Sequence, residues 1–441
     1  MAAKLFGTDG VRGLAGTELT AEIALALGRA GAMESATARP QVLIVRDTRE
    51  SGPMLEAALA AGVAEGGGDA WLGGVLPTPA ASILVRQHGL DLAAVVSASH
   101  NPWQHNGIKF FSADGRKLED EGEAGIEARV AQAGSEPGVP SGRVRELDGA
   151  LDDYRRALLS AFRLDLSGRR VLLDCANGAT YRAGPSVFER LDAEVETIGA
   201  EPDGRNINEG CGSIHPELLA ERIGRSGAEI GFAFDGDGDR VIAVDAQGRV
   251  RDGDELIALC ARHLADGGAL DGGVAVTVMS NYGFHQAMAD AGIEVATTPV
   301  GDRHVIAELE ERSWPLGGEQ SGHIIWSEYG PTGDGIAAAL LVMRALGGGE
   351  LAAAVPMQKL PQVLENVEVA DRQALDSATT VWEGVERESD ALEGRGRVLV
   401  RPSGTEPFIR VMVEAPTEDE ARRISDRLVA AVPATIGISS A

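Results

Sequence analysis

Short apolar runs alternate with amphipathic stretches along most of the chain. Near residue 41, "QVLIVRDTR" has the apolar, β-branched character of a strand, and "SGPMLEAALAAGVAEGG" after it has the spacing of a helix. The succession returns near residue 170, where "RRVLLDCANGAT" precedes "AGPSVFERL" and "AEVETI". It returns again near residue 273, where "GVAVTVMSN" precedes "GFHQAMADAGIEVATT". Strand, helix and strand in succession predict three related α/β domains with helices packed on mixed sheets. We expect Ser51 to cap the first of these helices, with Pro53 in its first turn.

Each of the three units ends in a polar loop rich in small residues. The first loop, "SASHNP" (97–102), follows the apolar run "LDLAAVV", which we expect to be a buried strand. The second is "FDGDGDR" (234–240) and the third is "GGEQSGH" (317–323). Loops at strand ends are where α/β folds place their chemistry. The sequence therefore predicts one cleft to which each α/β domain contributes a loop.

The last part of the chain has a different pattern. "GRVLVRPSGTEPFIRVMVEA" (396–415) predicts two strands joined by a turn, and "TEDEARRISDRLVAAV" (417–432) predicts a helix. Thr417 and Glu420 have capping-box spacing, and one helix face carries Ala421, Ile424 and Leu428. This indicates a smaller α+β domain. We place the four domains at 1–148, 149–249, 250–359 and 360–441, with "GSEPGVPSG" (134–142) as a surface loop or linker near the first boundary.

The composition restricts the partners and the compartment. The chain has 441 residues and a formal net charge of -27, so its far field repels nucleic acid and anionic membranes. An anionic substrate would need a local cluster of arginines. The three cysteines have no paired spacing, which indicates small buried residues in a reducing compartment. No apolar run approaches the ~20 residues of a membrane span, and no secretory segment is visible. We therefore expect a cytoplasmic protein.

The acidic loop places three carboxylates at alternate positions, on Asp235, Asp237 and Asp239. Clustered carboxylates repel one another unless a cation joins them, and their hard oxygen ligands suit Mg²⁺ or Ca²⁺. An EF-hand is excluded, because Arg240 stands where that loop requires Gly and Ala246 stands where it requires Glu. The alternative is a solvated acidic turn. The apolar flanks "IGFAF" and "VIAV" favour a buried metal loop.

Ser99 in "SASHNP" is the candidate nucleophile. A serine hydroxyl is weakly reactive without an activating base or metal, and no GxSxG elbow surrounds it, which argues against acyl transfer. A phosphoserine would carry about -1.5 to -2 charge, which an acidic loop tolerates only together with a divalent ion. Taken alone, the loop could equally be a serine turn; taken with the acidic loop, it indicates phosphoryl transfer.

Two further segments carry candidate binding groups. "RPSGTEPFIR" combines guanidinium groups, hydroxyls and a glycine in the manner of a phosphate cradle, with Arg401, Ser403, Gly404, Thr405 and Arg410; its alternative is a polar hairpin turn. "GGEQSGH" offers Glu319 and Ser321 as partners for sugar hydroxyls and His323 as an acid or base. "NGIKF" supplies Lys109, and "GTDGVRG" supplies Arg12. Each of these last two would carry no weight singly.

Taken together, these motifs resemble the α-D-phosphohexomutase superfamily, from "FGTDGVRG" near the start to "RPSGTEPFIRVMVE" near the end. The resemblance implies three related α/β domains and a smaller α+β domain around a central cleft. It implies that Ser99 is the phosphoserine and, with Asp235, Asp237 and Asp239, binds Mg²⁺. It assigns phosphoryl transfer and proton handling to Arg12, Lys109, His323 and Arg240. It assigns sugar binding to Glu319 and Ser321, and clamping of the second phosphate to Arg401, Ser403, Gly404, Thr405 and Arg410.

The resemblance also implies a reaction. It is an isomerisation of a small phosphosugar through phosphoserine and a hexosamine 1,6-bisphosphate, which serves as primer and intermediate. Gln320 is typical of the branch acting on glucosamine phosphates, which supplies the amino-sugar precursor of the cell wall. The phosphomannomutase/phosphoglucomutase branch is the rival within the family, and a metal-dependent phosphatase and a non-catalytic phosphosugar sensor are rivals from different functional classes. His105 departs from the family, which usually has Asp there. A homodimer is compatible with the resemblance.

Overall fold

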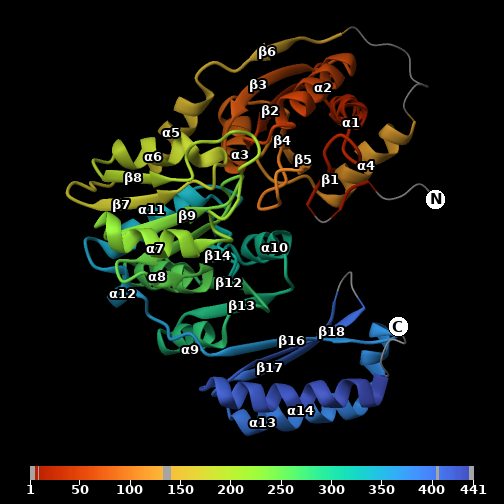
Figure 1. Cartoon of the computed structure of the whole chain (residues 1–441). Helices are drawn as coiled ribbons and strands as arrows, with labels where there is room; N and C mark the ends of the chain where they lie inside the picture. The colour runs from red at the N-terminus through yellow and green to blue at the C-terminus, as the bar shows by residue number, and fades with distance from the viewer. Residues whose placement is uncertain (1–4, 8, 133–140, 404–406, 437–441) are drawn as a thin grey trace. The chain divides into compact units, whose positions relative to one another are not determined.

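The computed structural model describes residues 5–7, 9–132, 141–403 and 407–436. The chain forms two compact units (Figure 1). The larger comprises Met1–Met279 and Glu294–Val355, and the smaller comprises Ser280–Ile293 and Pro356–Ala441. Most of the predicted linker at 134–142 lies outside the described residues.

Three mixed sheets form the framework of the larger unit. The first, in the order β1-β5-β4-β2-β3-β6, consists of β1 (Val11–Leu14), β2 (Gln41–Arg46), β3 (Asp69–Val75), β4 (Leu92–Val96), β5 (His105–Ser112) and β6 (Val144–Glu146). The second, in the order β11-β10-β9-β7-β8, consists of β7 (Arg170–Asp174), β8 (Glu194–Ile198), β9 (Ile230–Phe234), β10 (Val241–Asp245) and β11 (Val250–Arg251). The third, in the order β13-β12-β14-β15, consists of β12 (Gly273–Thr277), β13 (Glu294–Thr298), β14 (Leu316–Gly318) and β15 (Ile324–Trp326).

The three sheets share one four-strand arrangement. In the first, β3, β2 and β4 are parallel neighbours and β5 runs antiparallel to β4. The strands β8, β7, β9 and β10 repeat this order, and so do β13, β12, β14 and β15. Each predicted polar loop is the connection from the third of these strands to the fourth. The prediction of three related α/β domains is confirmed, and their common topology places the loops at equivalent positions.

Helices cover these sheets and connect their strands. They are α1 (Ala21–Glu34), α2 (Gly52–Glu65), α3 (Thr78–Gln87), α4 (Asp120–Ala131), α5 (Ala150–Ala161), α6 (Ala183–Glu189), α7 (Pro216–Ser226), α8 (Gly253–Asp266), α10 (Asp302–Arg312), α11 (Gly335–Leu346) and α12 (Leu351–Ala354), with a 3-10 turn, η1 (Ala179–Tyr181). One capping prediction is wrong. In the described chain Ser51 makes no side-chain cap bond to α2, because its backbone is helical (φ -75°, ψ -14°) and not extended as at a capping residue. Its hydroxyl accepts a hydrogen bond from Asn106 Nδ2 at 2.9 Å instead. Pro53 lies in the first turn, as predicted.

The smaller unit is the predicted α+β domain, joined by one helix from the preceding region. Its sheet has the order β16-β18-β17, with β16 (Gln362–Glu368), β17 (Arg397–Pro402) and β18 (Phe408–Glu414). Figure 1 shows α13 (Thr379–Leu392) and α14 (Glu418–Ile436) together on one side of this sheet; α9 (Tyr282–Asp290) and the 3-10 helix η2 (Arg372–Ser377) complete the unit. The predicted apolar face of α14 is confirmed, since Ala421, Ile424 and Leu428 are buried in the core. Thr417 Oγ1 accepts from Glu420 N at 3.2 Å, which is one half of the expected capping box.

His285 makes the stability of the smaller unit sensitive to acid. Its ring packs against Tyr282 and Phe284, and Nε2 is buried without a hydrogen-bond partner among the described residues. Burial, and then the charge of Arg397, lower the pKa of His285 from 6.5 to about 4. The folded unit therefore holds this imidazole neutral at pH values where the unfolded chain protonates it. The stability that it contributes is complete above pH 6.5 and is lost as the pH falls towards 4.

We expect His285→Gln to remove this acid sensitivity. Between about pH 7 and about pH 4.5, the free energy of unfolding of the smaller unit should fall by about 2 kcal/mol more in the wild type than in the variant. Hydrogen exchange of peptides from this unit, measured at both pH values in a urea series, gives the two differences. Equal pH dependence in both proteins would contradict the assignment, whatever the variant costs at neutral pH.

Two expectations about the chain as a whole concern cysteines and membrane spans. All three cysteines, at positions 175, 211 and 260, are free and buried, as predicted. Burial raises the pKa of the Cys211 and Cys260 thiols to about 12, so neither is a reactive thiolate at neutral pH. Within the described ranges, no helix has both the length and the apolar character needed to cross a bilayer.

Candidate active site

Ser99 lies in the connection from β4 to β5. The strand β4 is buried along its whole length, so the chain enters this loop from the interior. Ser99 adopts a φ of 50°, in the left-handed region that costs a residue with a Cβ about 1–2 kcal/mol. Its side chain is 1% exposed, and its Oγ donates a hydrogen bond to Asp235 Oδ2 at 2.6 Å. The first and second loops therefore meet at the serine hydroxyl, as the two motifs together predicted.

The acidic loop joins β9 to β10 and buries all three of its carboxylates. Asp235, Asp237 and Asp239 are 0%, 1% and 8% exposed, and their candidate ligand atoms lie within 4.8 Å of one another. Glycines make this close approach sterically permissible. A Cβ on Gly236 would lie 2.6 Å from the Ser99 carbonyl oxygen, and Gly238 has a φ of 74°. A solvated acidic turn is excluded by this burial.

The acidic triad is suited to a metal ion. Among the described residues, Asp237 Oδ1 and Asp239 Oδ1 are buried without any hydrogen-bond partner, which is costly unless a cation accepts their lone pairs. Burial raises the pKa of Asp235 well above its ordinary value, and the charges of Asp239 and Asp237 raise it further. A divalent cation bound by oxygen ligands would reverse both effects.

Lys109 from β5 brings positive charge to the same loop. Its Nζ donates to Asp237 Oδ2 at 2.8 Å and lies 3.7 Å from Asp9 Oδ2. Burial lowers the pKa of Lys109, but the carboxylates of Asp237 and Asp9 outweigh burial and hold it above its ordinary value. Arg12 and Lys117 also pair with Asp9. The predicted residues Arg12 and Lys109 thus lie in one cationic cluster, which Asp9 links.

His323 and Arg240 lie next to the other two carboxylates of the triad, those of Asp239 and Asp235. His323 Nδ1 is 3.6 Å from Asp239 Oδ2, and its Nε2 accepts a hydrogen bond from Gly333 N at 3.2 Å. Since Nε2 is an acceptor, the ring proton is on Nδ1 and faces Asp239. Arg240 donates its backbone N–H to Asp235 Oδ1 at 3.2 Å, and its Nη1 lies 3.5 Å from His100 Nδ1.

The third polar loop joins β14 to β15 and is held to the second domain by its backbone. Val241 N, in the second domain, donates to Gly322 O at 3.0 Å. Gly253 N, at the start of α8 in the third domain itself, donates to Gln320 O at 3.0 Å. Glu319 Oε1 accepts from Gly301 N at 3.1 Å, and Ser321 is exposed in the same loop. The structure therefore brings the second and third loops together around Asp239 and His323.

The predicted phosphate clamp lies in the smaller unit. Arg401 and Arg410 are direct partners across the antiparallel pair β17 and β18, so their side chains lie on one face of the sheet. Burial, and then the charge of Arg410, lower the pKa of Arg401. Ser403 is buried, and its N–H donates to Phe408 O at 2.8 Å. Gly404 and Thr405 lie outside the described residues. Two adjacent guanidinium groups on one face of the sheet suit an anion.

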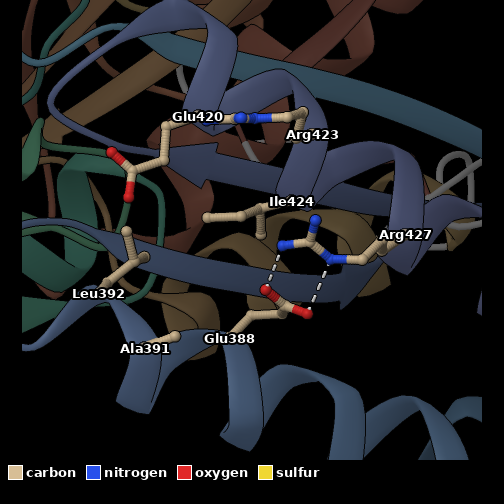
Figure 2. Close-up of a pocket in the computed structure, with 7 residues that line it drawn as sticks. All are labelled: Glu388, Ala391, Leu392, Glu420, Arg423, Ile424 and Arg427. Carbon is tan, nitrogen blue, oxygen red and sulfur yellow. Dashed lines mark hydrogen bonds and ion pairs between the residues drawn. The ribbon is translucent and has the colours of Figure 1, made fainter.

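A separate pocket in the smaller unit offers no comparable chemistry (Figure 2). It has a volume of about 210 Å³, lies between α13 and α14, and is lined by Glu388, Ala391, Leu392, Glu420, Arg423, Ile424 and Arg427. Glu388 and Arg427 form a two-point ion pair, with Nε–Oε1 at 3.0 Å and Nη2–Oε2 at 2.5 Å. The buried Glu388 carboxylate of this pocket therefore already has a cationic partner, Arg427.

Sequence reasoning missed several residues of the site. Thr78 Oγ1 donates to Asp237 Oδ2 at 2.6 Å, and His100 Nδ1 lies 3.5 Å from Ser99 Oγ. Burial, and then the charges of Arg240 and Arg12, lower the pKa of His100 and favour its neutral form. The position of His100 beside Ser99 was a usable signal. Nothing in the sequence indicated Thr78 as a site residue, because 159 residues separate it from Asp237.

A buried serine against an acidic loop, on three related α/β domains followed by a smaller α+β domain, defines a phosphohexomutase, and hence an isomerase. The chain belongs to the phosphoglucomutase/phosphomannomutase family. Sequence models of its alpha/beta/alpha domains I, II and III match residues 3–136, 152–248 and 252–363, and the model of its C-terminal domain matches residues 364–431.

Individual relatives are similar over nearly the whole chain. A phosphoglucosamine mutase from Desulforudis audaxviator is 50% identical over 438 residues, covering 97% of each chain. A phosphoglucosamine mutase from Moorella thermoacetica is 51% identical over 433 residues, covering 96% of this chain and 97% of the relative. A solved structure of a phosphoglucomutase/phosphomannomutase family protein from Burkholderia thailandensis has a TM-score of 0.85 at 26% identity, covering 98% of this chain and 97% of the other.

Proposed function

We propose that this protein interconverts glucosamine 6-phosphate and glucosamine 1-phosphate, the reaction of a phosphoglucosamine mutase. The observation that carries the proposal is the 2.6 Å hydrogen bond from Ser99 Oγ to Asp235, inside a loop whose other buried carboxylate oxygens suit a cation. The choice of glucosamine phosphates rests on the names of relatives that are about half identical over nearly the whole chain. The product would supply the amino-sugar precursor of the cell wall.

The reaction proceeds in two phosphoryl transfers. Phosphorylated Ser99 passes its phosphoryl group to the O1 hydroxyl of glucosamine 6-phosphate, which forms the 1,6-bisphosphate. The bisphosphate turns end over end, and its 6-phosphoryl group passes to the Ser99 hydroxyl. Glucosamine 1-phosphate then leaves. Each transfer breaks one P–O bond and forms another, and the proton of the attacking hydroxyl goes to a nearby base. Primer 1,6-bisphosphate restores any enzyme that has lost its phosphoryl group.

The chain's own residues prepare Ser99 for both transfers. In the unphosphorylated state, Asp235 Oδ2 holds the serine proton through the 2.6 Å hydrogen bond. Because the side chain is 1% exposed, the protein excludes water that would otherwise hydrolyse the phosphoserine. Lys109 and Arg12 stabilise the charge of the transferring phosphoryl group, and so does Arg240, which lies next to Asp235 and Asp239. His323 orients Asp239 through Nδ1, and its role as a proton carrier stays a prediction.

The residues of this site fit Mg²⁺, which Asp235, Asp237 and Asp239 would hold together with Ser99. When bound, Mg²⁺ offsets the negative charge of the phosphoryl group and of the three carboxylates. The orphaned oxygens of Asp237 and Asp239 support this ligand set. Among hard cations, Mg²⁺ is the one that proteins most often hold with a few carboxylates and a phosphate.

Recognition of the sugar phosphate is divided between two loops. Glu319 and Ser321 bind sugar hydroxyls, and Arg401, Ser403 and Arg410, with Gly404 and Thr405, bind the phosphate that is not transferred. The clamp must accept the sugar in both orientations, which suits groups that recognise phosphate by charge and hydrogen bonding. These guanidinium groups provide the local positive charge that a protein of net charge -27 needs for an anionic substrate.

We also place the reaction in the cytoplasm. Three free, buried cysteines are compatible with a reducing compartment. The net charge of -27 disfavours nucleic acid as a partner. A homodimer stays a prediction.

A comparison of three substrates tests the proposal. With bisphosphate primer and Mg²⁺ present, we expect kcat/KM for glucosamine 6-phosphate to exceed that for glucose 6-phosphate and mannose 6-phosphate by about tenfold or more, within what binding contacts to one substituent achieve. Coupled assays of the 1-phosphates give the three values. A preference for glucose or mannose would assign the other branch of the family. Release of inorganic phosphate without isomerisation would indicate a phosphatase, and binding without any turnover would indicate a sensor.

A further inference from the structure

Arg49 lies fully buried beneath the Ser99 loop, where nothing described so far uses it. It follows β2 and has 0% exposure. Its guanidinium donates to four carbonyl oxygens of the segment 99–105. They are those of Ser99 at 2.8 Å, Asn101 at 2.8 Å, Pro102 at 2.5 Å and His105 at 2.9 Å. One side chain thus holds the whole turn that displays the serine.

The same arginine is connected to the amide of Ser99. Its Nε donates to Asp47 Oδ2 at 2.8 Å, and Ser97 Oγ donates to that oxygen at 2.6 Å. Ser97 Oγ in turn accepts from Ser99 N at 3.0 Å. The carbonyl and the amide of Ser99 are therefore both held from one buried ion pair.

The second domain adds a contact from the other side. Asn208 Nδ2 donates to the carbonyl oxygens of Ser99 and Asn101, at 3.0 and 3.2 Å. Asn208, from the loop between β8 and α7, itself has a φ of 60°. The Ser99 carbonyl is thus fixed by donors from two domains, while its Oγ faces Asp235 in the second. A left-handed serine persists only where its surroundings determine it in this way.

We propose that Arg49 is a positioning residue for phosphoryl transfer. It holds the Ser99 carbonyl directly, and it holds the Ser99 amide through Asp47 and Ser97. Its guanidinium holds Ser99 in the left-handed conformation that directs Oγ to the acidic loop. This inference rests on the proposed function. A lysine keeps the charge but has one nitrogen, which cannot reach four carbonyls and Asp47 together. The inference therefore predicts that a charge-conserving change at this position impairs the chemical step.

Arg49→Lys tests the proposal against a matched control, Arg46→Lys. Arg46 ends β2 and donates to Glu56 Oε2 at 3.0 Å and to the backbone oxygen of Asp47 at 3.3 Å. The control therefore changes a partly buried arginine of the same segment whose side chain bonds neither to the Ser99 loop nor to the Asp47 carboxylate. Both variants and the wild type are incubated with bisphosphate primer, and intact mass gives the phosphoserine content of each. Single-turnover experiments then give the transfer rate per phosphorylated enzyme, beside KM for glucosamine 6-phosphate and the fraction folded by circular dichroism.

We expect Arg49→Lys to lower the transfer rate about 100-fold, since small misplacements of reacting atoms have effects of this size, with KM within about threefold of the wild type. Arg46→Lys should transfer at the wild-type rate. A merely structural role would lower the folded or phosphorylated fraction and leave the rate per phosphorylated enzyme unchanged, and that result would overturn the proposal.

If Arg49→Lys does not fold, Ser97→Ala replaces it. A loss of about tenfold in the transfer rate at constant KM supports the proposal, and an unchanged transfer rate overturns it. Failure of the wild type to isomerise any phosphosugar would instead refute the proposed function.

Discussion

We expect the replacement of Ser99 by alanine to lower kcat by about 10⁴-fold or more, to the background of the assay. The variant has no oxygen to carry the phosphoryl group, and no other described hydroxyl takes the place of the one that donates to Asp235 Oδ2. Intact mass after incubation with bisphosphate primer should show one phosphoryl group on the wild type and none on the variant. A coupled assay for glucosamine 1-phosphate gives the rates.

Ser167→Ala is the control for this experiment. Ser167 is an exposed serine whose hydroxyl bonds to Asp165 on the surface. This variant should be phosphorylated and active like the wild type. Full turnover by the Ser99 variant, or a phosphoryl group found elsewhere on it, would end the phosphoserine mechanism.

Asp237→Asn should lower kcat by about 10³-fold and weaken Mg²⁺ binding at least about tenfold. The variant removes one of three clustered charges and replaces one carboxylate oxygen by an amide nitrogen, which cannot bind a cation, while side-chain volume is preserved. It also removes the charge to which Lys109 Nζ donates at 2.8 Å. Activity measured against Mg²⁺ concentration, and the rise of Tm on adding Mg²⁺, are the two readouts, because an ion that binds the folded state raises Tm.

Asp245→Asn distinguishes loss of the metal from loss of a buried charge. Asp245 is buried at the end of β10, and its Oδ2 accepts from Arg249 and Arg251, each at 2.9 Å. We expect this control to lower Tm and to keep the wild-type response to Mg²⁺. An Asp237 variant with unchanged Mg²⁺ dependence would show that the triad is not the metal site.

Much of the framework follows from local pattern. The apolar runs at 41–46 and 92–96 predict strands, and both are strands in the structure. The face of α14 was predictable from the spacing of its apolar residues. Ser51 shows the limit of such reasoning: a capping residue in the expected position is bonded instead to Asn106, which lies 55 residues away. A local rule does not exclude a competing partner that only the fold supplies.

The sequence by itself determined the classes of residue in four candidate segments, which are a serine loop, an acidic loop, the polar loop of the third domain and an arginine pair in the smaller unit, each written within a few consecutive positions. Only the tertiary structure decided which groups control them. Arg49, Thr78 and Asn208 hold the serine or the acidic loop from positions 50 to 159 residues away in sequence. The physical reason is that hydrogen-bond partners are set by distance in the folded chain. The common strand order places each loop at the same end of its own sheet, and the packing of the domains then brings side chains of different loops together.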